Sequence, residues 1–424
     1  MTNVSNRIPN HLALAIYSCM RGMRRYTLSP VRTSNRLLRL TTLALPARSG
    51  TVASYTLGEP ASLQVSAQPA TSRSVYAAAH IVADPLRASA EGGPDQIDWD
   101  RTLRLRHRLW DLGLGVAEAM DTSQRGMGLD WPAARELGRR SIAEAAARDA
   151  KVVVGIATDQ LSAGETDLAA VQDAYLEQLT EFERAGGEVV LMASRQLAGA
   201  ASNAEDYLTV YDAVLREASR PVILHWLGDV FDPALAGYWG HDDPSQAMKV
   251  VCDLIADHPR QVRGIKVSLL DADLERELRG QLPAGVRLFT GDDYHYTDLI
   301  AGDGAHHSDA LLGAFAVLGR HASAALVRLD AGDPAGFREI LAPTEALSQL
   351  VFAAPTQFYK VGVAWLAYLE GAQDHFRMIG GFETGRSLGH LGDLVRAADG
   401  IGLFPDPDFT ARRAALYFAA QGIG

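Results

Sequence analysis

The chain of 424 residues is 47% hydrophobic and 21% charged, with a formal net charge of −11. This composition is typical of a globular protein with a large core, and the acidic balance argues against nucleic acid as the main partner. Because no apolar run approaches the roughly 20 residues of a membrane span, we predict a protein without membrane contact. The two cysteines, Cys19 and Cys252, have no metal-type spacing, which favours a reducing, cytoplasmic location.

Residues 1–58 differ chemically from the rest of the chain, because they contain eight arginines and neither Asp nor Glu. An Arg- and Ser-rich, acid-poor N-terminus is typical of transit peptides. The alternative that we favour is a start codon assigned too far upstream. Under either interpretation we expect residues 1–58 to be a disordered segment outside the fold.

After Gly58, short apolar runs alternate with longer stretches whose apolar residues recur near the 3.6-residue helical period. The predicted strands are Val75–Ala83, Leu114–Met120, Val152–Ala157, Val189–Ala193, Val222–Trp226, Gly264–Ser268, Val286–Thr290 and Thr297–Ala301. The predicted helices between them are Arg101–Asp111, Pro132–Asp149, Leu168–Ala185, Ala204–Ala218, Ser245–Asp257 and Asp271–Arg279. Candidate N-caps are Asp98–Asp100, Ser245 and Asp271.

This alternation of strand and helix indicates right-handed parallel units, and near-continuous apolar strands are expected when both faces of a sheet are covered. Eight strands predict an α/β protein, a (β/α)8 TIM barrel over residues 59–308. An open doubly wound sheet is the alternative, but no Gly-rich phosphate fingerprint follows the first strand. From Asp309 onward the pattern is helical, and we predict that residues 309–424 form a helical extension packed on the barrel.

In such a barrel the active site is built at the carboxyl ends of the strands. The predicted strands there lead into a set of polar or glycine residues. These candidates are Asp121, Thr122, Ser123, Arg195, His225, Asp292, Asp293, Gly304, His306 and Ser308. Arg195 would bind an anionic substrate group or pair with a surface Asp.

Lys266 is the most informative residue, since it lies in an apolar strand. By two-residue alternation, Ile265 and Val267 face the helices, whereas Lys266 shares the inner face with Gly264. A lysine is almost never buried without a partner or a purpose. Burial favours the neutral amine, which attacks a carbonyl to form a Schiff base. The alternative is a structural salt bridge from Lys266 to Asp292 or Asp293.

Several short segments together resemble one enzyme superfamily. They are Gly264–Ile265–Lys266, Phe289–Thr290–Gly291–Asp292–Asp293, Gly302–Asp303–Gly304–Ala305 with Ser308, and Ile81–Pro85 followed by Ile97–Asp98–Trp99. Across roughly residues 75–370, the chain resembles the dihydrodipicolinate synthase and N-acetylneuraminate lyase superfamily of class I aldolases. More narrowly, it resembles a branch for which no substrate is implied. The resemblance implies a Schiff base on Lys266, no cofactor, a small-molecule substrate and a homo-oligomer.

Two departures from the superfamily pattern affect the substrate. The oxyacid-binding Gly-Thr-Thr-Gly-Glu is replaced by Asp121–Gly126, in which Thr122 keeps the hydroxyl role that the resemblance implies. On the fifth strand, His225 stands where the family has a proton-relaying tyrosine, and histidine can serve as general acid or base. The carboxylate-binding arginine expected just beyond is also missing.

We therefore predict a Schiff-base-forming lyase or aldolase acting on a small carbonyl compound, either sugar-derived or a 2-oxo acid. His225 and Thr122 would move protons, Asp292 or Asp293 would orient the lysine or a substrate hydroxyl, and the 302–308 loop would contact the substrate. One alternative is a metal-dependent isomerase or epimerase, in which histidines and carboxylates at the mouth hold a divalent metal. Another is a barrel that has lost its chemistry and binds a sugar.

Overall fold

Eight parallel strands form a closed barrel in the computed structural model, which describes residues 42–91, 93–164 and 167–424. Around the barrel the strands follow the order β10–β3–β4–β5–β6–β7–β8–β9. Their bounds are β3 Val75–Ala78, β4 Gly115–Glu118, β5 Val152–Ile156, β6 Glu188–Leu191, β7 Val222–Leu227, β8 Val262–Ser268, β9 Arg287–Thr290 and β10 Asp309–Leu312. The prediction of a TIM barrel is confirmed.

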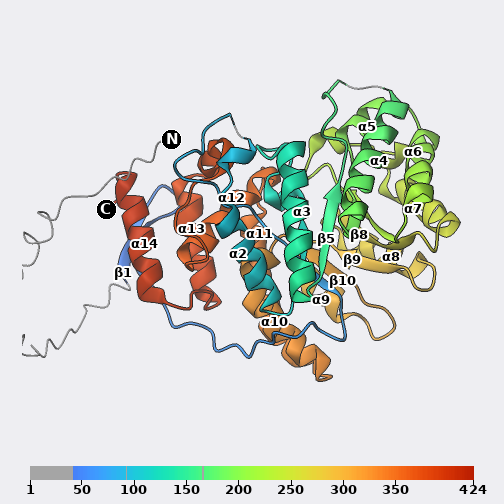
Figure 1. Ribbon diagram of the computed structural model, residues 1–424. Helices are drawn as coiled ribbons and strands as arrows, with labels where there is room; N and C mark the ends of the chain where they lie inside the picture. The colour runs from blue at the N-terminus through green and yellow to red at the C-terminus, as the bar shows by residue number, and fades with distance from the viewer. Residues whose placement is uncertain (1–41, 92, 165–166) are drawn as a thin grey trace, which may run out of the picture. The chain divides into compact units, whose positions relative to one another are not determined.

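Helices follow the strands in alternation and cover the outside of the barrel (Figure 1). They are α2 Trp99–Trp110, α3 Trp131–Arg148, α4 Leu168–Arg184, α5 Arg195–Ala200, α6 Ala204–Glu217, α7 Pro244–Asp257, α8 Ala272–Gln281, α9 Tyr296–Ala301 and α10 Phe315–Asp330. Short 3-10 helices also occur: η2 Pro94–Gln96, η3 Asp121–Ser123, η4 Pro233–Leu235, η5 Tyr238–Gly240, η6 Thr356–Phe358 and η7 Ile379–Gly385.

Aspartates begin many of these helices by accepting hydrogen bonds from otherwise unpaired backbone N–H groups. Asp98 accepts from Arg101 N at 2.9 Å, and Asp271 accepts from Leu274 N at 3.0 Å, as predicted. Helix α7 differs, because its N-cap is Asp243, which accepts from Ser245 N at 2.9 Å. The expected cap Ser245 is therefore one residue inside the helix, next to a proline that starts its first turn.

Alternation along the strands divides the buried side chains into two layers, as in other barrels. Apolar residues of one set fill the barrel interior: Tyr76, Ala78, Ala117, Met120, Val153, Ala157, Val190, Met192, Ile223, Phe289 and Leu311. Intervening residues, such as Ile265 and Val267, pack with the surrounding helices.

The eighth strand is not where the sequence pattern placed it. Thr297–Ala301 belongs to helix α9, and β10, at Asp309–Leu312, closes the barrel by pairing with β9 and β3. The strand Asp-Ala-Leu-Leu contains no β-branched residue, so its propensity is helical and tertiary pairing overrides it. The predicted barrel boundary at residue 308 therefore leaves out the last barrel strand, β10, and the chain is not wholly helical from Asp309.

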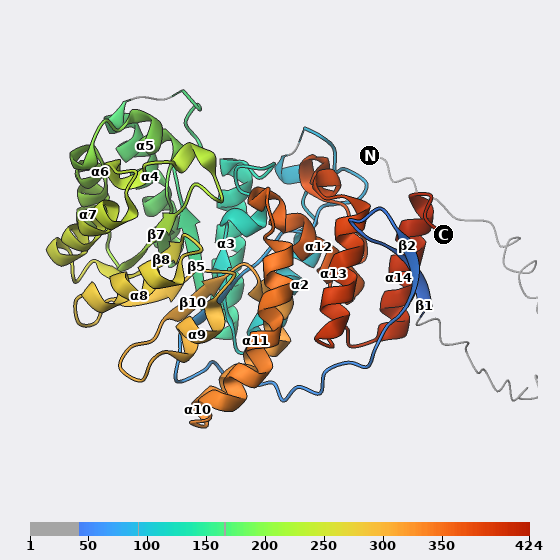
Figure 2. The same cartoon turned by 180° about the vertical axis from the view of Figure 1, so that it is seen from behind.

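The C-terminal part contains four helices, α11 Pro334–Val351, α12 Tyr359–Leu369, α13 Leu388–Gly400 and α14 Pro407–Ala420. An antiparallel hairpin, β1 Thr42–Pro46 with β2 Val52–Thr56, packs on α13 and α14 (Figure 2). Arg396 fixes it by donating to the carbonyls of Pro46 and Leu45 at 2.8 and 2.9 Å.

The expectation that all of residues 1–58 stay outside the fold is thus wrong for residues 42–58. Leu43, Leu45 and Leu57 are buried in the core that the C-terminal helices share. Residues 1–41, including Cys19, lie outside the described residues. Among the described helices, none combines the length and the apolar character that a membrane crossing requires.

Candidate active site

Lys266 lies inside the barrel near the carboxyl end of β8, as alternation predicts. Its neighbours in register are His225 on β7 and Phe289 on β9. The side chain is 8% exposed, yet its ammonium makes neither a hydrogen bond nor an ion pair with the described residues. Gly291 leaves room for it, since a Cβ there would lie 2.8 Å from Lys266 Cε.

The Lys266 side chain borders a small cavity of about 20 Å³, which is close to the volume that one water molecule needs. The cavity is lined by polar and apolar residues at or near the carboxyl ends of six strands and in the C-terminal extension. They are Ala78, Met120, Asp121, Thr122, Leu227, Phe231, Lys266, Ser268, Asp293, Gly313, Phe352 and Tyr359. Of the sequence-predicted site residues, Lys266, Asp121, Thr122 and Asp293 thus meet in one place.

Two carboxylates act on Lys266 inside this cavity. Burial lowers the pKa of Lys266 below its ordinary value, and the charges of Asp121 and Asp293 oppose that shift. Burial likewise raises the pKa of Asp293 to about 7, helped by Asp292 and opposed by the Ala314 N–H group and by Lys266. The lowered pKa of Lys266 shifts its equilibrium toward the neutral amine, which is the nucleophilic form.

The neighbouring Asp292 has a different task. Its carboxylate accepts from the backbone N–H groups of Tyr294 and His295 at 2.8 and 3.1 Å and contacts His295 Nδ1 at 2.9 Å. These bonds shape the turn after β9. Asp292 therefore positions Asp293, and only Asp293 reaches the cavity.

A tyrosine that the sequence analysis missed supplies a phenol to the cavity. Tyr359, at the start of α12, has its hydroxyl 2.9 Å from Thr122 Oγ1, and burial raises its pKa well above the ordinary value. Phe352 stacks on its ring at 4.3 Å between centroids. A Cβ at Gly313 would lie 3.2 Å from Thr122 Oγ1, so the glycine after β10 gives this hydroxyl pair its space.

His225 is close to Lys266 but does not line the cavity. Its Nε2 lies 3.2 Å from Ser268 Oγ, its Nδ1 has no hydrogen-bond partner among the described residues, and Ser268 in turn lines the cavity. Burial, and secondarily Lys266, lower the pKa of His225 well below its ordinary value. The lowered pKa favours the neutral imidazole, which contacts the cavity lining through Ser268.

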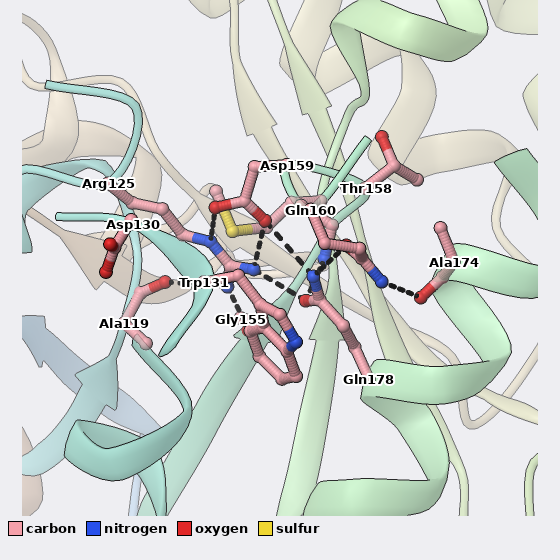
Figure 3. A network of polar contacts seen from close by, with 12 residues as sticks. Ala119, Arg125, Asp130, Trp131, Gly155, Thr158, Asp159, Gln160, Ala174 and Gln178 are labelled. Atoms are coloured by element: carbon pink, nitrogen blue, oxygen red, sulfur yellow. Dashed lines mark hydrogen bonds and ion pairs between the residues drawn. The ribbon is translucent and has the colours of Figure 1, made fainter. Parts of the chain in front are cut away.

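A buried network holds the segment that carries Asp121 and Thr122 (Figure 3). Arg125 binds Asp159 through two hydrogen bonds of 2.9 and 2.6 Å and donates to Gln178 at 2.5 Å and to the Gly155 carbonyl at 2.6 Å. Two-pronged arginine–carboxylate pairs are geometrically specific. Arg125 thus ties the segment after η3 to the carboxyl end of β5 and to the middle of α4.

This geometry can be compared with known proteins. The sequence pattern of a family described as "Protein of unknown function (DUF993)" matches residues 43–423. The chain belongs to this family. A search of curated proteins gave no match.

Among solved structures, the fold is similar to dihydrodipicolinate synthases. The enzyme from Thermotoga maritima is 15% identical with a TM-score of 0.57, over 78% of this chain and 99% of the other. The enzyme from Aquifex aeolicus is 14% identical with a TM-score of 0.58, over 78% and 98% of the two chains. The predicted resemblance to that superfamily is confirmed for the fold of this DUF993 protein.

Ser123 and Arg195 do not reach the cavity of the DUF993 protein. Ser123 donates its hydroxyl to the Met120 carbonyl at 2.6 Å and so closes the turn of η3. The Arg195 guanidinium is exposed and forms an ion pair with Asp232. Two roles were predicted for Arg195, binding of an anionic substrate group or pairing with a surface Asp. The structure shows the pairing with an Asp.

Gly304, His306 and Ser308 lie at the other end of the barrel, because their loop precedes β10 instead of following a strand. Ser308 is buried and donates to Glu275 Oε1 at 2.8 Å, while Gly304 and His306 are exposed. The expectation that these residues contact the substrate is corrected accordingly. It rested on the misplaced eighth strand.

The histidines of the predicted barrel mouth, among them His225, His295 and His306, are also separated. His225 is inside the barrel, His295 is bound to Asp292 on the turn after β9, and His306 is on the opposite loop. Within the described ranges, no group of three or more His, Cys, Asp or Glu residues has an arrangement fit for a metal ion. The metal-dependent alternative thus finds no ligand set there.

Proposed function

We propose that this protein is a Schiff-base-forming lyase or aldolase that acts on a small carbonyl compound. One observation carries the proposal: Lys266 is a buried lysine without a bonding partner among the described residues, and it borders a cavity lined by carboxyl and hydroxyl groups. A structural lysine would be expected to have a bonded partner. The dihydrodipicolinate synthase-like fold supports the same reaction type.

The reaction begins when the neutral amine of Lys266 attacks the substrate carbonyl carbon. The resulting carbinolamine loses its hydroxyl as water, taking a proton from the Tyr359–Thr122 hydroxyl pair, and leaves an iminium. The iminium accepts the electrons of an adjacent C–C bond as that bond breaks, or gives an enamine that forms such a bond. Asp293 orients the amine, and Ser268 connects His225 to the same space.

Access requires movement of the aromatic cover, since the cavity has no room for a substrate as it stands. Phe231, from the segment after β7, packs edge-on against Phe352 and Tyr359, with ring centroids 6.2 and 6.5 Å apart. These rings exclude water once substrate is bound. Dry surroundings strengthen the electrostatic interactions on which iminium chemistry depends.

Borohydride reduction in the presence of carbonyl compounds tests the proposal, because it converts an iminium into a stable secondary amine. Only four lysines occur, at positions 151, 249, 266 and 360, so peptide mass mapping locates any adduct unambiguously. We expect the adduct on Lys266, and Lys249→Ala serves as an exposed control that still forms it. A Lys266→Ala variant that keeps full activity would contradict the proposal.

A further inference from the structure

The charges around the cavity identify the class of carbonyl compound that it accepts. We infer that the substrate is an uncharged hydroxy aldehyde or hydroxy ketone whose hydroxyl donates to Asp121, and that 2-oxo acids are rejected. The inference rests on the proposed imine chemistry at Lys266. It names the substrate class for that same site.

Asp121 is the first observation. Its carboxylate lines the cavity, yet it accepts no hydrogen bond from any residue that the structure describes. Carboxylates can accept hydrogen bonds at about four lone-pair sites, and a half-buried carboxylate is stabilised when those sites are used. A substrate hydroxyl is a neutral donor that meets this need, whereas a substrate carboxylate is an acceptor that repels it.

The second observation is that no cation is left over for an anionic substrate. Lys266 is the only cation among the residues that line the described cavity, and it faces two acidic groups, Asp121 and Asp293. Once Lys266 has become an iminium, its charge is already balanced. A carboxylate on the carbon next to the iminium would therefore add an uncompensated negative charge to a small, largely buried site.

The cations just outside the cavity are already engaged. Arg195 forms its ion pair with Asp232. Lys360, the residue after Tyr359, directs its ammonium to the Gln357 carbonyl at 3.3 Å and to Met127 Sδ at 3.5 Å. It lies over the Tyr359 ring, and its charge already interacts with that of Asp121. Neither side chain borders the cavity.

The rest of the lining fits a short hydroxylated carbon chain. Thr122 and Tyr359 present hydroxyls that both donate and accept, which suits a substrate hydroxyl or carbonyl oxygen. Leu227, Phe231 and Phe352 present apolar surface. Specificity therefore follows from favourable contacts with a neutral substrate and from repulsion of an anion.

Borohydride trapping with matched carbonyl compounds tests this inference on the full chain. Hydroxyacetone and pyruvate differ by a hydroxymethyl group in place of a carboxylate, and methyl pyruvate is pyruvate without the charge. The rate of adduct formation on Lys266 with each compound is divided by the rate at which the same compound reacts with N-acetyl-lysine. This ratio corrects for the intrinsic reactivity of the compound toward amines. We expect hydroxyacetone and methyl pyruvate to be trapped about tenfold or more faster than pyruvate, a ratio equivalent to about 1.4 kcal/mol.

The Asp121→Asn variant keeps the size of the side chain and removes the charge. We expect it to lower the preference for hydroxyacetone over pyruvate to about threefold or less, while Asp229→Asn, an exposed change on the segment after β7, leaves the preference unchanged. Preferential trapping of pyruvate by the unmodified protein would overturn the inference and leave the proposed imine chemistry intact. Absence of any Lys266 adduct with all three compounds would overturn the proposed function itself.

Discussion

Two buried charge clusters lie at different places around the same strands and are built in opposite ways. Outside the barrel, between α2, β4 and α3, Glu118 binds Arg106 through two bonds of 2.7 and 2.8 Å and also accepts from Ser141 Oγ at 2.5 Å. The Arg106 guanidinium additionally donates to the carbonyls of His80 and Thr102. Inside the barrel, Lys266 and Asp121 make no such bonds with the described residues.

The difference is that one buried charge is fully compensated, whereas the other has the environment that the proposed imine chemistry would need. Burying an ion is costly unless hydrogen bonds and an opposite charge compensate for the lost water, and the Arg106–Glu118 cluster has that compensation in full. The side chains of Lys266 and Asp121 lack these compensating hydrogen bonds among the described residues, and they border the cavity instead. Incomplete compensation at a carboxyl-end cavity is what a group that must bind and release a substrate requires.

Replacing Lys266 gives the largest expected effect. Lys266→Met should remove the borohydride adduct and lower turnover of a trapped substrate by about 1,000-fold or more, because the nucleophile is lost. The same change should leave the melting temperature equal or higher, since a poorly compensated buried charge is removed. A marked fall in melting temperature would show that Lys266 is structural.

Replacing Arg106 tests the other cluster. Arg106→Met should lower the free energy of unfolding by about 3–5 kcal/mol, because Glu118 is left buried without its cation. Chemical denaturation measures this value. The double variant Arg106→Met/Glu118→Leu should recover most of the loss, and trapping on Lys266 should persist wherever the protein is folded. If the double variant were as unstable as Arg106→Met alone, an unpaired buried Glu118 charge would not be the cause of the loss.

Removing the phenol of Tyr359 should lower the rate of adduct formation by about 100-fold, the usual contribution of a positioned proton donor. Tyr359→Phe is matched by Tyr296→Phe, because the Tyr296 hydroxyl is also buried and bonded, to Thr344 Oγ1 at 2.6 Å, but lies outside the cavity. Both variants should lose about 1 kcal/mol of stability. Equal trapping rates in the two would show that Tyr359 does not act in proton transfer.

The smallest expected effect concerns Glu275, which bonds to Ser308 and Thr290 away from the cavity. Burial raises the pKa of Glu275 to about 8. The folded protein then binds a proton that the unfolded chain releases near pH 4.5, so stability falls as the pH rises from about 4.5 to 8. Glu275→Gln should make denaturation curves across this range depend less steeply on pH. An unchanged pH dependence would contradict a protonated Glu275.

The sequence predicted the barrel and the position of Lys266 because both depend on local periodicity. Strand and helix periods differ, and alternation along Val262–Ser268 is enough to assign Lys266 to the inner face. Asp121, Thr122 and Asp293 followed from the rule that strand carboxyl ends share one face. The same rule placed Ser308 wrongly, since Asp309–Leu312 has no strand propensity and was not recognised as the eighth strand.

The tertiary structure alone brought Tyr359 to Thr122, two residues separated by 237 positions along the chain. No periodicity marks such a contact, because it depends on how α12 packs over the barrel mouth. Likewise, only the packed structure distinguishes Asp293, which faces Lys266, from Asp292, which holds a turn. The sequence by itself thus determined the barrel and the position of Lys266, while the contact of Tyr359 with Thr122 and the different surroundings of Asp292 and Asp293 were decided by long-range packing.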